Sequence, residues 1–199
     1  MSLARLRHLA PRATLVLALT MVLLQLAGPA TRMSLRYDRA AVLDGEAWRL
    51  VTAHLVHFDL VHLAWNLLGL ALVAWLFARD FDLRGWLLIL AASTLAIDAG
   101  FLVFVPELSW YVGFSGVLHG AMAAGLLAWL AHSRDWVTWL ASGLFAAKLL
   151  WEHFAGPLPF TAATLALPVV HEAHSYGALG GLAAACWLEW RRQAGTPSL

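Results

Sequence analysis

Charged residues and cysteine are both scarce in this sequence, and each scarcity excludes a class of protein. Only 13% of the 199 residues are charged, whereas an average soluble domain has about 25%. The single cysteine, Cys186, excludes an internal disulfide and a cysteine-based cluster. In their place the chain has 61% hydrophobic residues and 11 tryptophans, which suit a membrane protein with aromatic anchors at the lipid surfaces.

Several apolar segments have the length of a membrane-spanning helix, which needs about 17–25 residues. Short polar breaks separate them, such as Arg79–Arg84 and His132–Asp135. We therefore expect an all-α membrane protein in which residues 1–199 form one domain, a bundle of six transmembrane helices. The expected helices cover about residues 13–30, 59–78, 85–105, 114–131, 136–154 and 169–190.

The first apolar segment has two interpretations. It follows Arg5, Arg7 and Arg12, as the apolar part of a secretory signal peptide follows its basic part. A retained first helix is simpler, because the rest of the chain is also apolar. With the N-terminus inside, eight of the 13 Lys and Arg residues fall on the cytoplasmic side and four in the outer loops. This bias favours two cytoplasmic termini.

Two motifs place a serine and a histidine in apolar segments. Gly113-Phe114-Ser115-Gly116 opens the fourth segment, and His174 lies near the start of the sixth. A serine hydroxyl becomes a nucleophile when a base such as histidine takes its proton, and ionisable groups inside a membrane indicate function. Both segments start at the outer face in the expected topology. The pattern therefore predicts an intramembrane serine protease.

A second pair of polar residues lies at the same expected depth. His62 and Asn66 are four residues apart, on one face of the second expected helix. Both side chains can donate hydrogen bonds, which acyl transfer needs at the developing oxyanion. The same residues could instead join two helices by hydrogen bonds.

Glycines accompany the serine and the histidine. Gly116 and Gly120 lie beside the serine, and Gly177 and Gly181 follow the histidine at helical spacing. Small residues at this spacing let two membrane helices pack closely. We therefore expect the fourth and sixth helices to bring the serine hydroxyl within hydrogen-bond reach of the histidine.

Taken together, these motifs resemble the rhomboid family of intramembrane serine proteases over about residues 45–185. The shared motifs are His-x-x-x-Asn in the second helix, Gly-x-Ser-Gly opening the fourth and Ala-His-x-x-Gly-x-x-x-Gly in the sixth. The resemblance implies a six-helix rhomboid-like bundle with Ser115 as nucleophile and His174 as base. His62, Asn66 and the Ser115 backbone N–H would line the oxyanion hole, supported by Gly113.

The resemblance also implies the partners. We expect no cofactor, no metal and no nucleic acid. The substrate would be a membrane-anchored protein with a single transmembrane helix, cut within the lipid bilayer near its outer face. The expected location is a bacterial inner membrane, with the active site open to the outer side.

One departure from the family pattern is informative. Rhomboids commonly have an aromatic residue four positions after the serine, whereas this chain has His119. His119 could stack on His174 or hydrogen-bond it. The compact chain and the run from Tyr111 to Gly120 look most like the rhombosortase branch. Members of that branch are associated with surface proteins that carry a C-terminal Gly-Gly motif, a membrane helix and a basic tail.

Other polar residues receive structural interpretations. We expect Lys148 to pair with Asp98 or with Glu152 one turn later, and none of the three to act in catalysis. His171 is expected at the water-exposed rim. The segment 155–168 is a candidate lid beside the last helix.

Two other functions stay open at this stage. A membrane metallohydrolase could use the histidines on the outer side, although no His-Glu-x-x-His motif is present. A rhomboid relative could also bind membrane helices without cutting them, but such relatives typically lack the serine or the histidine. The histidines that a metallohydrolase could use are His54, His57, His62, His171 and His174.

Overall fold

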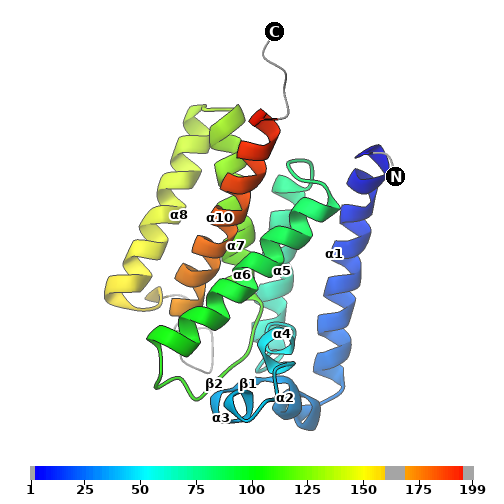
Figure 1. Cartoon of the computed structure of the whole chain (residues 1–199), viewed down its shortest axis with the longest axis vertical. Helices are drawn as coiled ribbons and strands as arrows, with labels where there is room; N and C mark the ends of the chain where they lie inside the picture. The colour runs from blue at the N-terminus through cyan, green and yellow to red at the C-terminus, as the bar shows by residue number, and fades with distance from the viewer. Residues whose placement is uncertain (1–2, 160–168, 195–199) are drawn as a thin grey trace.

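Long helices packed side by side make up most of the computed structural model (Figure 1), which describes residues 3–159 and 169–194. The long helices are α1 (Leu3–Leu26), α5 (Leu60–Phe77), α6 (Leu83–Phe104), α7 (Ser115–His132), α8 (Trp136–Ala155) and α10 (Glu172–Ala194). The first loop contains α2 (Pro29–Leu35), α3 (Arg39–Leu43), α4 (Arg49–Thr52) and strand β1 (Tyr37–Asp38), and strand β2 (Trp110–Tyr111) precedes α7. The expected lid at 155–168 lies mostly outside the described residues.

Aspartates at the ends of the polar breaks explain where several helices begin. The carboxylates of Asp59, Asp82 and Asp135 accept hydrogen bonds of 2.7–2.9 Å from backbone N–H groups three residues later. Such N-caps satisfy groups that the first turn of a helix leaves unpaired. As a result α5, α6 and α8 begin within two residues of the expected positions, whereas α1 begins earlier and α10 extends further than the hydropathy pattern predicted.

The outward faces of the helices are apolar, as a lipid environment requires. Leu95 of α6, Leu144 of α8 and Leu179 of α10 are each more than 60% exposed, and water-soluble monomers rarely expose large apolar patches of this kind. Among the described residues, α5 and α6 are long and apolar enough to cross a membrane, and α1 with α2, bent by 118° between them, could make a third span. The chain is therefore a mostly helical membrane protein.

The packing of α7 against α10 depends on glycine. A Cβ atom on Gly177 would lie 2.0 Å from the carbonyl oxygen of Gly116, and one on Gly181 would lie 2.0 Å from that of Gly120. The two backbones thus touch where the sequence motifs meet, as small residues allow. Helix α10 lies between α6 and α7, and the starts of α5, α7 and α10 lie at the same end of the bundle (Figure 1).

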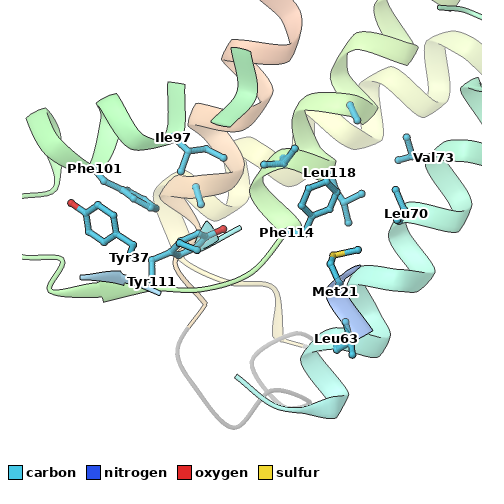
Figure 2. Packing of buried hydrophobic residues seen from close by; sticks show 14 of the residues in the cluster. Met21, Tyr37, Leu63, Leu70, Val73, Ile97, Phe101, Tyr111, Phe114 and Leu118 are labelled. Carbon is cyan, nitrogen blue, oxygen red and sulfur yellow. The ribbon is translucent and has the colours of Figure 1, made fainter. Parts of the chain in front are cut away.

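The first loop is fixed to the bundle beneath the start of α7. Strand β1 pairs with β2, and the Tyr37 and Tyr111 rings lie 5.6 and 5.0 Å from the Phe101 ring of α6 (Figure 2). The Arg39 guanidinium donates to the carbonyls of Phe101 and Leu102 at the end of α6. These contacts hold the segment that leads into Ser115.

Candidate active site

Ser115 and His174 meet where α7 and α10 begin. Ser115 is the first residue of α7, and His174 lies in the first turn of α10. The His174 Nε2 atom lies 3.1 Å from the Ser115 Oγ atom, within the reach required of a base and its nucleophile. The His174 side chain is only 5% exposed, so bulk water does not compete for this contact.

The other ring nitrogen of His174 has a partner that the sequence analysis missed. Its Nδ1 atom lies 2.9 Å from the Glu152 carboxylate near the end of α8. The Lys148 ammonium lies 2.5 Å from the same carboxylate oxygen. Of the two pairings expected for Lys148, the structure therefore shows the one with Glu152. The missed signal was a carboxylate near the end of an apolar helix.

Asp98 has a different partner from the expected Lys148. Its carboxylate lies 3.4 Å from the Nε2 atom of His54, and both side chains are buried. His54 belongs to the loop before α5, whereas Asp98 lies near the end of α6. The pair ties this loop to the bundle and does not touch Ser115, which agrees with a structural interpretation of Asp98.

His119 lies flat against His174. The two ring centroids are 3.9 Å apart and the ring planes differ by 14°. The His119 Nδ1 atom lies 2.7 Å from the backbone carbonyl of Ser115, and because a carbonyl only accepts, Nδ1 carries the hydrogen. Of the two contacts expected with His174, the structure shows stacking, and the hydrogen bond of His119 goes to its own helix.

His62 packs directly against the turn that precedes the serine. Gly113 has φ +122°, and a Cβ atom there would lie 2.6 Å from the His62 ring, so this turn requires glycine. The Gly113 N–H donates to the Ala53 carbonyl at 3.0 Å, and its own carbonyl accepts from the Tyr111 hydroxyl at 2.8 Å. The turn is therefore held on both sides while it leaves room for the His62 ring.

Asn66 is buried one turn further along α5. Its amide donates to the His62 carbonyl at 2.9 Å, which occupies one of its two amide hydrogens. Its Oδ1 atom is buried without a hydrogen-bond partner among the described residues. Asn66 and Ser115 line the same cavity.

His57 lies behind His62, in the loop before α5. The two rings meet edge to face with centroids 5.1 Å apart. Burial, and then the neighbouring His62, lowers the pKa of His57 to about 3. His57 is therefore neutral at physiological pH and acts as an apolar wall behind His62.

A cavity of about 400 Å³ opens beside the serine, between α5, α7, α8 and α10. Its wall is mostly apolar, and it includes the side chains of Ser115 and His174. A cavity of this kind suits a largely apolar segment that presents one polar group for chemistry. The lining residues are Trp65, Asn66, Gly69, Val73, Ser115, Leu118, His119, Met122, Phe145, Lys148, Glu152, Val169 and His174.

The five histidines considered from the sequence do not form a metal site among the described residues. In the part of the chain that the structure describes, the group spaced for a metal ion is His119, Glu152 and His174, with ligand atoms within 4.8 Å of one another. The two ring nitrogens of His174 already contact Glu152 and Ser115. A metal ion would therefore have to displace one of these contacts. His171 instead lies 3.7 Å from the Glu172 carboxylate at the start of α10.

Comparison with known proteins agrees with this geometry. The Rhomboid domain family profile matches residues 44–191, about three quarters of the chain, including Ser115 and His174. The rhomboid protease GluP of Bacillus subtilis (strain 168) is 26% identical over 113 residues, which are 57% of this chain and 22% of that protein. The match thus spans about a fifth of the relative's length. On the family match, this chain belongs to the rhomboid family.

Proposed function

We propose that this protein is a serine-type intramembrane endopeptidase that uses Ser115 as nucleophile and His174 as base. The observation that carries the proposal is the 3.1 Å approach of His174 Nε2 to Ser115 Oγ, in the wall of a mostly apolar cavity. The relative GluP is named a rhomboid protease. A relative that only binds helices would not need the contact between His174 and Ser115. The contact therefore supports cleavage over helix binding alone.

The chemistry follows from the contact between the Ser115 hydroxyl and the His174 ring. His174 Nε2 takes the proton of Ser115 as Oγ attacks the scissile carbonyl, and the carbonyl oxygen becomes an oxyanion. His174 then gives this proton to the leaving amine, so that the peptide bond breaks and an acyl-enzyme remains. Water, activated by the same histidine, releases the acyl group and restores the serine.

The oxyanion would be stabilised by donors at the starts of α5 and α7. The N–H of Ser115 is one of the first N–H groups of α7, which have no partner within the helix and carry the positive end of its dipole. The His62 ring, beside Gly113, and the Asn66 amide complete the set. Loss of one such donor typically costs about 2.7–4 kcal/mol of transition-state stabilisation.

His119 supports this arrangement by its stacking on His174. It occupies the position of the family's aromatic residue, and the run from Tyr111 to Gly120 supports assignment to the rhombosortase branch. On that basis the substrate class is a membrane-anchored protein with a single transmembrane helix and a Gly-Gly motif. Glycine lowers the cost of unwinding a helix at the cut site, which agrees with such a motif.

The proposed topology has six spans, with both termini on the cytoplasmic side of a bacterial inner membrane. Eight of the 13 Lys and Arg residues then lie inside, in agreement with the positive-inside rule. The site would open to the outer side, because the starts of α5, α7 and α10 share one end of the bundle (Figure 1).

Cleavage by purified protein in lipid vesicles tests the proposal. A single-helix reporter with Gly-Gly before its membrane helix should be cut by the wild-type protein, and Ser115→Ala should lower the rate by at least about 10⁴-fold. A zinc chelator should leave the rate unchanged, because the proposed steps use only side chains. Cleavage that survives Ser115→Ala and stops with the chelator would establish metal-dependent hydrolysis in its place.

A further inference from the structure

The Glu152 carboxylate connects two groups that belong to different helices. One of its oxygens lies 2.9 Å from His174 Nδ1 on α10 and 2.5 Å from Lys148 Nζ on α8. The Glu152 side chain is only 1% exposed. We infer that Glu152 is a positioning residue that completes a Ser115–His174–Glu152 triad, with Lys148 holding its carboxylate in place. This inference rests on the serine protease function proposed above.

The first argument concerns the tautomer of the histidine. An ionised carboxylate only accepts hydrogen bonds, so the 2.9 Å contact with Glu152 places the ring hydrogen on Nδ1. Nε2 then presents its lone pair to the Ser115 hydroxyl 3.1 Å away. Without the carboxylate the ring could place its hydrogen on Nε2 instead, and it would then be unable to accept the serine proton.

The second argument concerns charge in an apolar surrounding. When Ser115 gives up its proton, His174 becomes a cation that is almost wholly buried, which is costly without a partner. The Glu152 carboxylate already lies beside Nδ1 and stabilises this cation as it forms. Lys148, with a side chain 27% exposed, balances the carboxylate in the resting state. The pair therefore keeps a negative group next to the histidine without a net buried charge.

The third argument concerns the orientation of the ring. His119 covers one face of the His174 ring at 3.9 Å, which limits tilting of the ring plane. The hydrogen bond from Nδ1 to Glu152 limits rotation within that plane. The two contacts are therefore complementary, and neither alone fixes the direction of Nε2 toward Ser115.

A purely structural ion pair is the competing explanation. Lys148 and Glu152 are four residues apart on one helix, and such pairs are common helix stabilisers worth about 0.2–0.5 kcal/mol. That explanation requires no contact with another helix, whereas the same carboxylate oxygen of Glu152 meets both Lys148 and the His174 ring. The two explanations predict different kinetics for the same variants.

The test compares three variants in vesicles with the single-helix reporter. Glu152→Gln should lower kcat by about 10²- to 10⁴-fold with KM changed less than about threefold, because substrate contacts remain. Glu152→Asp keeps the charge but shortens the side chain, so it should recover about tenfold of that loss and stay below the wild-type kcat. Lys148→Met should cost less than about tenfold, since it removes only the group that holds the carboxylate. Thermal unfolding in detergent and titration of the reactive serine with a fluorophosphonate give the folded, competent fraction of each.

The outcomes separate this inference from the proposed function. If Ser115→Ala is inactive but Glu152→Gln has the wild-type kcat per competent site, the triad is wrong and the dyad stands. If Ser115→Ala still cleaves, the serine mechanism itself fails. A loss in Glu152→Gln that is explained by its folded fraction also overturns the inference. Should Glu152→Gln not fold, Glu152→Asp decides, because a wild-type kcat in that variant contradicts a geometric role.

Discussion

Replacing His174 with alanine is expected to lower kcat for the single-helix reporter by about 10⁴- to 10⁶-fold. The serine hydroxyl has His174 Nε2 at 3.1 Å as the base in hydrogen-bond contact with it. A serine without a base is protonated at neutral pH and is a poor nucleophile. KM should change little, because His174 contributes only a small part of the cavity wall.

The double variant sharpens this prediction. Substitutions of residues that act in the same proton transfer do not have additive effects on the free energy of activation. The double variant with Ser115→Ala and His174→Ala should therefore be no slower than either single variant. Rates are measured on reconstituted protein, with circular dichroism as the check that both variants keep their helices. Losses that multiply in the double variant would show that Ser115 and His174 act in separate steps, contrary to the proposed mechanism.

Adding one methyl group at Gly177 is expected to destabilise the bundle and inactivate it. The new Cβ atom would lie 2.0 Å from the backbone oxygen of Gly116, and backbone cannot move aside as a flexible side chain can. We expect Gly177→Ala to lower stability by about 3 kcal/mol, which is about 6–12 °C in Tm for a chain of this size. Activity should fall by about 10²-fold or more, because α7 and α10 carry the serine and the histidine.

Gly143 provides the matched control for this substitution. It lies within α8, and a Cβ atom there meets nothing within 4 Å. Gly143→Ala should therefore leave activity unchanged and raise Tm slightly, since alanine favours helix over glycine by about 1 kcal/mol. Thermal unfolding and reporter cleavage are measured for both variants under the same conditions. Equal Tm values for Gly177→Ala and the wild type would contradict the close contact of α7 with α10.

Local patterns in the sequence predicted the parts of the site that follow from residue spacing within each helix. Glycine spacing predicted the close approach of α7 and α10, which the structure shows at Gly177 and Gly181. The pairing of Lys148 with Glu152 was also among the expectations, because four residues make one helical turn. The prediction that Ser115 and His174 lie at equal depth required only the order of the apolar segments along the chain.

The sequence did not predict contacts between helices that share no motif. The approach of Glu152 to His174 depends on how α8 is rotated about its own axis relative to α10, and hydropathy does not fix this rotation. The pairing of His54 with Asp98 depends on the path of the first loop, which β1 and β2 tie to a segment more than 70 residues later. Non-local contacts of this kind follow from packing and not from local spacing.

Covalent labelling of Ser115 tests the central claim most directly. The folded protein in native membranes is treated with a fluorophosphonate, digested and mapped by mass spectrometry. The mechanism predicts an adduct on Ser115 that forms at least about 10²-fold more slowly in His174→Ala and is absent from heat-unfolded protein. A preparation that cleaves the reporter but shows no adduct on Ser115, or labels equally without His174, would contradict it.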